Sequence, residues 1–207
     1  MKQFILAAVA IIFFAANTQA IVIDTFDDTS QSVTSGGGPA GPDIAAAPEA
    51  IGGVRTVEIL DSQGVNQTTA AVVPSIGSYT HSNDAGNTFG SSKVSWDAGG
   101  ADLTADNQFS IEIQEIDQGT VDITLSVNGV EVTVMDAGVG TLDIAYADFG
   151  GVDFSNVNAI MLQVDASSAS DLILDLVETT NTGVPEPVTA TLGLIGLAGL
   201  TMRRRRH

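Results

Sequence analysis

Residues 119–135 constrain the fold more than any other part of the sequence, because they specify two strands and the turn that joins them. On either side of Asn128-Gly129, apolar side chains occupy every second position and alternate with Asp, Thr, Ser and Glu. Such alternation is typical of a strand with one buried face, and Asn-Gly is the preferred dipeptide of two-residue hairpin turns. This turn brings three apolar pairs onto one face: Val127 with Val130, Leu125 with Val132, and Ile123 with Val134. The turn and the alternation therefore predict one hairpin in one register.

The same alternation recurs through the rest of the chain, where helical patterns are missing. Further strands are predicted at residues 54–60, 70–73, 91–96, 109–114, 142–147, 160–165 and 172–177. About ten short strands separated by Gly, Asn and Asp predict an all-β fold of two packed antiparallel sheets, a β-sandwich. A parallel β-helix is the structural alternative, although the chain shows no repeat of roughly 20–50 residues. Residues 35–53 are expected to be a flexible or binding loop, and residues 179–183 a polar linker.

Charge is distributed unevenly along the chain, whose net charge is −18. Between residues 21 and 178 the basic residues are Arg55 and Lys93 alone, whereas every acidic residue except Glu186 lies there. A body this acidic repels phosphate backbones, so we expect no nucleic-acid partner. The acidity either keeps an exported domain soluble or binds divalent cations. Cysteine is absent, so stability must come from core burial or bound ions rather than from disulfides.

The N-terminus has the three parts of a secretory signal peptide. Lys2 supplies the basic start, and residues 4–16 form an apolar stretch. Thr18-Gln19-Ala20 offers small residues at the two positions that a signal peptidase reads. Cleavage after Ala20 would start the mature protein at Ile21. A retained N-terminal anchor is the alternative.

The C-terminus joins a proline motif, an apolar segment and a cluster of arginines. Pro185 and Pro187 fix the backbone and remove two donors, so residues 184–187 are predicted to be extended and accessible to a processing enzyme. As a helix rising about 1.5 Å per residue, residues 188–202 would span roughly 23 Å, short of the roughly 30 Å hydrocarbon core. The arginines that follow can reach the headgroups and hold the tail on the cytoplasmic side. A C-terminal core helix is the alternative, but this segment is apolar all round.

Residues 184–207 resemble the PEP-CTERM sorting signal of exported proteins in Gram-negative bacteria. The resemblance rests on Val184-Pro185-Glu186-Pro187, on the apolar segment, which is short, and on Arg203-Arg204-Arg205-Arg206. It implies recognition by an exosortase, a membrane transpeptidase-like enzyme, and a transient anchor in the inner membrane. It also implies release of the body to the cell surface or the extracellular matrix. The chain is thus predicted to contain a signal peptide (1–20), a β-sandwich (21–178), a linker (179–183) and a sorting tail (184–207).

The body is more weakly similar to exported jelly-roll domains of galactose-binding type. Three segments carry this similarity: Ile23-Asp24-Thr25-Phe26-Asp27 near the start, the turn Gly52-Gly53-Val54-Arg55, and Asp171-Leu172-Ile173-Leu174-Asp175 near the end. The similarity implies a jelly roll whose first and last strands lie together, and it implies sugar binding.

Two carboxylates suggest a calcium site. Asp24 and Asp175 each share the face of a predicted strand with two apolar residues. A buried carboxylate needs a partner or an ion. If the first and last strands adjoin, these two side chains converge, and Asp27 adds a further oxygen of the kind that Ca²⁺ prefers. The alternative is an Asp that faces water at a strand end or accepts a backbone N–H.

Trp96 and Tyr79 are the candidate sugar-contacting residues, because aromatic rings form platforms for sugars. Trp96 keeps phase with Val94, which favours a place in the core. Tyr79 lies in the polar stretch 78–84 and is expected in a surface loop. His81 lies in the same stretch without a nucleophile elbow elsewhere, so we expect a solvated histidine and no enzyme.

These features predict an exported, non-catalytic protein with a structural or adhesive role in an extracellular polysaccharide matrix, as the sorting resemblance implies. The alternative function is that of a carbohydrate-binding module, stabilised by calcium. The expected partners are a signal peptidase, an exosortase-like enzyme and polysaccharide.

Overall fold

Residues 20–182, except 65, 85 and 87, are described by the structure, a computed structural model. Most of the predicted signal peptide and the whole of the predicted sorting tail, from Val184 to the arginines, lie outside the described residues. Within the described part of the chain, no helix is long and apolar enough to cross a membrane.

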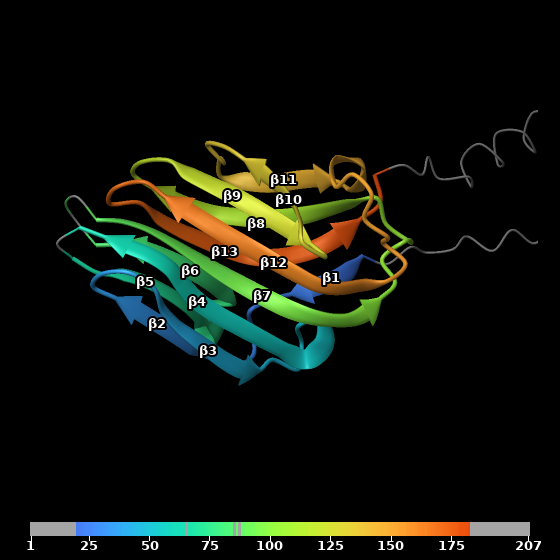
Figure 1. Ribbon diagram of the computed structural model, residues 1–207, viewed down its shortest axis with the longest axis horizontal. Helices are drawn as coiled ribbons and strands as arrows, with labels where there is room; N and C mark the ends of the chain where they lie inside the picture. Colours follow the sequence, from blue (N-terminus) through green and yellow to red (C-terminus); the bar gives the residue numbers. More distant parts are fainter. Residues whose placement is uncertain (1–19, 65, 85, 87, 183–207) are drawn as a thin grey trace, which may run out of the picture. The chain divides into compact units, whose positions relative to one another are not determined.

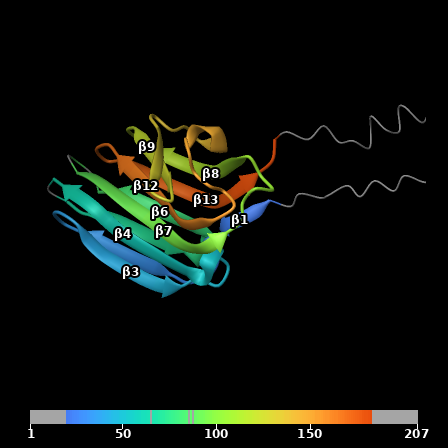
Figure 2. The ribbon, with the colours of Figure 1, turned by 45° about the vertical axis from the view of Figure 1, so that its right-hand side comes forward.

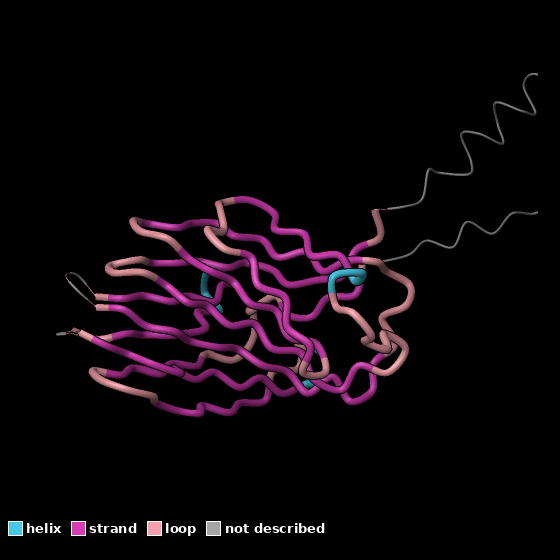
Figure 3. Tube along the Cα trace, turned by 45° about the horizontal axis from the view of Figure 1, so that its top comes forward, coloured by secondary structure: helices cyan, strands magenta, loops and turns pink. Residues whose placement is uncertain are grey.

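The described residues form thirteen strands, which pair antiparallel into two sheets (Figure 1). One sheet has the order β11 (Gly140–Ala145), β8 (Gln108–Asp117), β13 (Asp171–Thr180), β6 (Ser78–Asn83), β5 (Thr68–Val73) and β2 (Gln31–Ser35), with β1 (Ile21–Asp24) also against β13. The six-stranded sheet has the order β10 (Val130–Val134), β9 (Val121–Val127), β12 (Val157–Ala166), β7 (Phe89–Ala101), β4 (Val54–Gln63) and β3 (Ala40–Ala46). The 3₁₀ turns are η1 (Ile51–Gly53), η2 (Pro74–Ile76) and η3 (Tyr146–Asp148), the short helical pieces in Figure 3.

The two sheets pack face to face (Figure 2), and the apolar half of each alternation points between them. Val57, Val94 and Leu162 come from the six-stranded sheet, and Ile111 and Leu172 from the other; all are fully buried. Each such side chain contributes about 1.5–3 kcal/mol on burial, so the interior is the main source of stability. The predicted all-β, antiparallel jelly-roll sandwich is confirmed. The first and last strands, β1 and β13, are paired as the jelly-roll resemblance implied.

The predicted hairpin is formed by β9 and β10. Val127 pairs with Val130, Leu125 with Val132 and Ile123 with Val134, the register expected from the sequence. Asn128 and Gly129 have φ angles of 50° and 83°. Both positive angles are those that a type I′ turn requires, which explains why Asn and Gly occupy these positions.

Three segments differ from the sequence prediction. Residues 78–83, expected in a loop, form β6, because the inward residues Tyr79, His81 and Asn83 find polar partners in the interior. Residues 40–46, within the expected loop 35–53, form the edge strand β3, where a proline is tolerated. The last strand also runs beyond residue 178 into the expected linker, because the buried Thr179 donates to Asp106.

Candidate functional site

Asp24 is buried in the interior, and its partner is an arginine. Its Oδ1 accepts hydrogen bonds from the Phe26 amide at 2.8 Å and from Arg55 Nη1 at 2.9 Å. Its Oδ2 accepts from Arg55 Nη1 at 2.9 Å and from Trp96 Nε1 at 2.7 Å. The side chains of Asp24 and Arg55 are both fully buried. The sequence rule that a buried carboxylate needs a partner or an ion is therefore met by a cation that the chain itself supplies.

Every donor of the Arg55 guanidinium is used. Besides Asp24, Nε donates to Gln31 Oε1 at 2.7 Å, and Nη2 donates to Asp28 Oδ1 at 3.0 Å and to the Thr29 carbonyl at 2.7 Å. The guanidinium carbon also lies 5.6 Å from the centre of the Phe26 ring. This cluster joins β1 and the segment after it to β4 and β7, so it fastens one sheet to the other.

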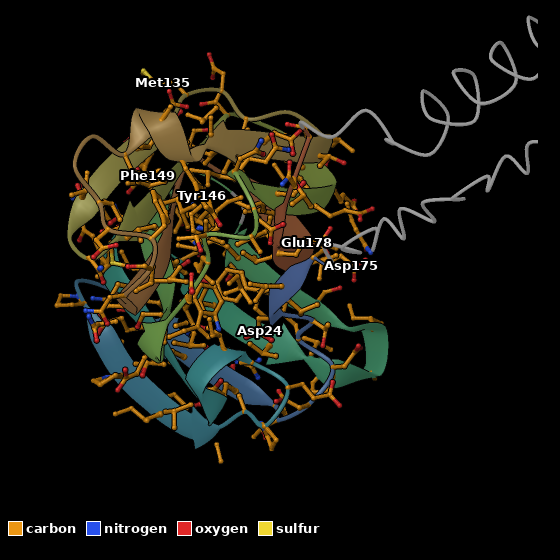
Figure 4. All side chains as sticks on the ribbon, turned by 90° about the vertical axis from the view of Figure 1, so that its right-hand side faces the viewer. Asp24, Met135, Tyr146, Phe149, Asp175 and Glu178 are labelled. Atoms are coloured by element: carbon orange, nitrogen blue, oxygen red, sulfur yellow. The ribbon has the colours of Figure 1, made fainter. Side chains whose placement is uncertain are left out.

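The remaining residues predicted for calcium do not gather around Asp24. Asp27 is exposed, and Asp175 lies half-exposed at an irregularity of β13 between Leu174 and Leu176. Figure 4 shows Asp175 nearer the edge of the molecule than Asp24. Among the described residues, no group of three or more His, Asp or Glu side chains is placed to hold a metal ion. The calcium site stays a prediction from the sequence.

Tyr79 and Trp96, the predicted sugar-contacting residues, both face the interior. Trp96 is 2% exposed, so its expected place in the core is confirmed. Tyr79 is fully buried, and its hydroxyl lies 2.6 Å from Ser92 Oγ. The expectation of a surface loop at Tyr79 is wrong, because its alternation with His81 and Asn83 belongs to an inward strand face.

His81 is buried rather than solvated. Its Nδ1 lies 2.7 Å from Ser92 Oγ, while its Nε2 has no hydrogen-bond partner. Burial lowers the pKa of His81 to about 4, with a smaller opposing contribution from Asn83. A serine beside a histidine has the geometry of a nucleophile and its base, but both residues are fully buried, so a substrate has no access.

The outer face of the six-stranded sheet carries mostly polar side chains in transverse rows. One row runs across β4, β7, β12 and β9 through Asp61, Ser91, Asp165 and Asp122. The next runs through Glu58, Lys93, Gln163 and Thr124, and a third through Thr56, Ser95, Met161 and Ser126. Lys93 is paired with Glu58. Glu58 therefore neutralises the charge of Lys93. The row with three aspartates keeps an excess of negative charge.

Two hollows lie on this face along β4, β7 and β12. One, of about 180 Å³, is lined by Asp61, Phe89, Gly90, Ser91, Asp165 and Ala166. The other, of about 350 Å³, is lined by Val54, Thr56, Ser95, Trp96, Asp97, Asn158, Ala159, Ile160 and Met161. The row of Glu58, Lys93 and Gln163 lies between them. From Phe89 to Asp97, β7 covers roughly 26 Å at about 3.3 Å per residue, so the two hollows follow the length of one strand.

Phe89 is the aromatic residue that sequence reasoning missed. It is 49% exposed, and no other aromatic ring of the described residues is among the exposed large apolar side chains. Its position could have been inferred, because Trp96 faces inward with Val94 and β7 alternates. Phe89, Ser91, Lys93 and Ser95 must then face outward together.

The carboxylates of the first hollow have neutral partners. Asp61 accepts from its neighbours, the Ser62 amide at 2.9 Å and Gln63 Nε2 at 2.5 Å. Asp165 accepts from Gln163 Nε2 at 2.8 Å. No cation neutralises either side chain within the described residues. Both therefore keep lone pairs for donors of a ligand.

Comparisons with known proteins give a likeness of fold only. No family model matches the chain. No curated protein matches its sequence. Among solved structures, the family 11 carbohydrate-binding module of the cellulase Lic26A-Cel5E of Clostridium thermocellum is 14% identical, with 79% of this chain and 95% of that chain covered and a TM-score of 0.40. TmCBM61 in complex with β-1,4-galactotriose is 11% identical, with 75% and 90% covered and a TM-score of 0.35. A likeness of this order transfers neither a ligand nor a residue's role.

Proposed function

We propose that this protein binds polysaccharide without turning it over, along the exposed face of its six-stranded sheet. The observation that carries the proposal is the pair of hollows on β4, β7 and β12, one of which presents Phe89 beside two carboxylates. Binding of this kind would hold an exported protein in a polysaccharide matrix, so it accounts for the structural or adhesive role that the sorting resemblance implies.

The chemistry of the face suits a sugar chain. A pyranose ring presents C–H groups on its faces, which pack on an aromatic ring, and hydroxyl groups at its rim, which donate to carboxylates. Phe89 offers the ring, and Asp61 and Asp165 offer acceptors on either side of Ser91. Hydrogen bonds to ionised groups are stronger than neutral ones, which favours carboxylates as sugar acceptors.

Charge restricts the class of polysaccharide. The row with Asp61, Asp165 and Asp122 is negative, and Lys93, the cation of this face, is already paired. Polymers of uronic acids would be repelled by this face and by the acidic body as a whole. We therefore expect neutral or amino-sugar polymers as ligands, and we expect binding of amino sugars to weaken as salt is added.

Replacing Phe89 with alanine is expected to weaken binding about tenfold or more, because the variant loses an apolar platform worth about 1.5–3 kcal/mol when fully covered. Asp165→Asn should have a comparable effect on amino sugars and a smaller one on neutral sugars. Affinities are measured by calorimetry with cello-oligosaccharides, chitosan oligosaccharides and oligogalacturonates.

Ile76→Ala provides the matched control, since Ile76 is 57% exposed in η2, away from this face. It should leave every affinity unchanged. Equal losses in Phe89→Ala and Ile76→Ala, or strongest binding to oligogalacturonates, would contradict the proposed site.

The proposed place of action rests on the two ends of the chain. If the signal peptide and the sorting tail are processed, protein recovered from the cell surface begins at Ile21 and ends near Val184. Mass spectrometry of the terminal peptides measures both ends. An intact arginine tail on surface material would refute sorting by an exosortase and leave the glycan-binding proposal untouched.

A further inference from the structure

Asp106 is a buried carboxylate with no cationic side chain beside it among the described residues. It is 6% exposed, its Oδ2 accepts from the Thr179 hydroxyl at 2.5 Å, and its Oδ1 has no hydrogen-bond partner. Both basic residues of the described chain are committed elsewhere, Arg55 to Asp24 and Asp28, and Lys93 to Glu58. An ionised carboxylate away from water is costly unless a positive charge or a proton balances it.

Thr179 connects this carboxylate to the beginning of β1. Its Oγ1, which bonds Asp106, also lies 3.4 Å from the carbonyl oxygen of Ile21. In the strand register, Ile21 is the partner of Thr179, and Val22 is the partner of Glu178. The backbone of Ile21 thus lies beside the hydroxyl group that holds Asp106.

The surroundings of Ile21 are negative. Burial raises the pKa of Glu178, and the charges of Asp106 and Glu112 add to this shift. Burial also raises the pKa of Tyr146, the nearby side chain of Thr179 opposes this shift, and the charge of Asp106 adds to it. Figure 4 shows Glu178 on the side of the molecule where β1 begins. Asp24 is already neutralised by Arg55.

We propose that Asp106 is the binding site for the α-ammonium group of Ile21, which is created when the signal peptide is removed. Hydrolysis of the amide bond between Ala20 and Ile21 adds one water, leaves a carboxylate on Ala20 and frees an amine on Ile21, which takes up a proton. The new charge then lies at the start of β1, beside Thr179, where the described residues provide a carboxylate and no other cation. Export and final stabilisation are thereby coupled. The proposal rests on the predicted cleavage after Ala20 and is independent of the glycan-binding face.

The ion pair makes stability depend on pH in a definite direction. An α-amino group has a pKa of roughly 7.7–8.0 when free, and a carboxylate neighbour raises that value in the folded state. An amino group whose pKa is higher in the folded than in the unfolded chain stabilises the fold fully at any pH below its pKa in the unfolded chain. This stabilisation is lost as the pH rises through its pKa in the folded chain. The contribution should be present at pH 6 and absent near pH 10.

The test compares two forms of the processed chain from Ile21 to His207, one with a free and one with an acetylated α-amino group. We expect the α-amino pKa, followed by NMR, to lie about one unit above its free value, and the unfolding constant at pH 6 to be about tenfold smaller for the free form. At pH 10 the two forms should be equally stable. An unshifted pKa, or equal stability at pH 6, would overturn the proposal.

Variants of the acidic residues identify which carboxylate binds the α-ammonium group of Ile21. Asp106→Asn should return the α-amino pKa to its free value and abolish the difference between the two forms, whereas Glu131→Gln, an exposed acid of β10, should change neither. A pKa shift that survives in Asp106→Asn and disappears in Glu178→Gln would reject Asp106 as the site. If Asp106→Asn does not fold, the free and acetylated forms of the natural sequence still decide whether the charge matters. A mature chain beginning elsewhere than at Ile21 would also reject the proposal.

Discussion

Replacing Arg55 with methionine is expected to lower the free energy of unfolding by about 3–5 kcal/mol, the usual cost of leaving one partner of a buried ion pair uncompensated. Asp24 would keep the hydrogen bonds from Trp96 and Phe26 but lose its balancing charge. Gln31 would lose a partner as well. Thermal unfolding should show a midpoint roughly 6–20 °C lower, since 1 kcal/mol shifts a domain of this size by about 2–4 °C.

Lys93→Met is the matched control for this prediction. Lys93 and Arg55 are both strand residues paired with an acid, but the side chains of Lys93 and Glu58 are 26% and 22% exposed. Water screens such a pair, so its loss should cost about 0–1 kcal/mol. Similar losses in Arg55→Met and Lys93→Met would show that burial does not set the strength of the Arg55 cluster.

The double variant Asp24→Asn/Arg55→Met separates charge from packing. Removing both charges leaves a neutral interior, so the loss should be clearly smaller than the sum of the two single losses. Additive losses would mean that the hydrogen bonds and packing of each residue, rather than their mutual attraction, account for the effect.

Asp24 shows which part of the buried cluster could be predicted from the sequence. Its position on an apolar strand face predicted a buried carboxylate that needs a partner, and the structure agrees. The partner is 31 residues away on the opposite sheet. Alternation assigns a residue to a face but does not say which strands face each other, so an arginine and a calcium ion were equally compatible with the pattern.

The missed strand β6 illustrates a second limit. Its inward residues are Tyr79, His81 and Asn83, so the segment is as polar as a loop and its alternation carries no hydrophobic contrast. Their burial depends on partners from other strands, such as Ser92 for Tyr79 and His81, and Thr68 for Asn83. Hydrophobic periodicity predicts strands whose inward side chains pack by apolar contact. It does not detect strands whose inward side chains are polar and are held by hydrogen bonds.

The exposed face was inferable in part. The phase of β7, fixed by Trp96, predicts that Phe89 and Ser91 face outward together. The neighbours of Ser91 in the row, Asp61 and Asp165, could not be predicted, because they follow from the pairing of β7 with both β4 and β12. The proposed glycan site therefore combines one residue that the sequence could give with two that only the topology brings together.

The buried His81 leads to the second large effect, which concerns pH. Burial lowers its pKa to about 4 in the folded protein, whereas an unfolded histidine has a pKa of about 6.5. The unfolded state thus binds an extra proton between these values, and stability falls as pH falls through this window. At about 1.4 kcal/mol per unit, the loss attributable to His81 reaches about 3 kcal/mol near pH 4.

Acidic residues titrate in the same range, so the effect of His81 has to be isolated by difference. His81→Gln keeps a side chain that can hydrogen-bond Ser92 but cannot take up a proton. Urea unfolding of the natural protein and of this variant, at half-unit steps from pH 7 to pH 4, cancels the carboxylates common to both. We expect the natural protein to lose about 1.4 kcal/mol per pH unit more than the variant below pH 6. If the free energy of unfolding depends on pH in the same way in both proteins, His81 takes up its proton in the folded state as readily as in the unfolded state. The interior around Ser92 would then be open to water.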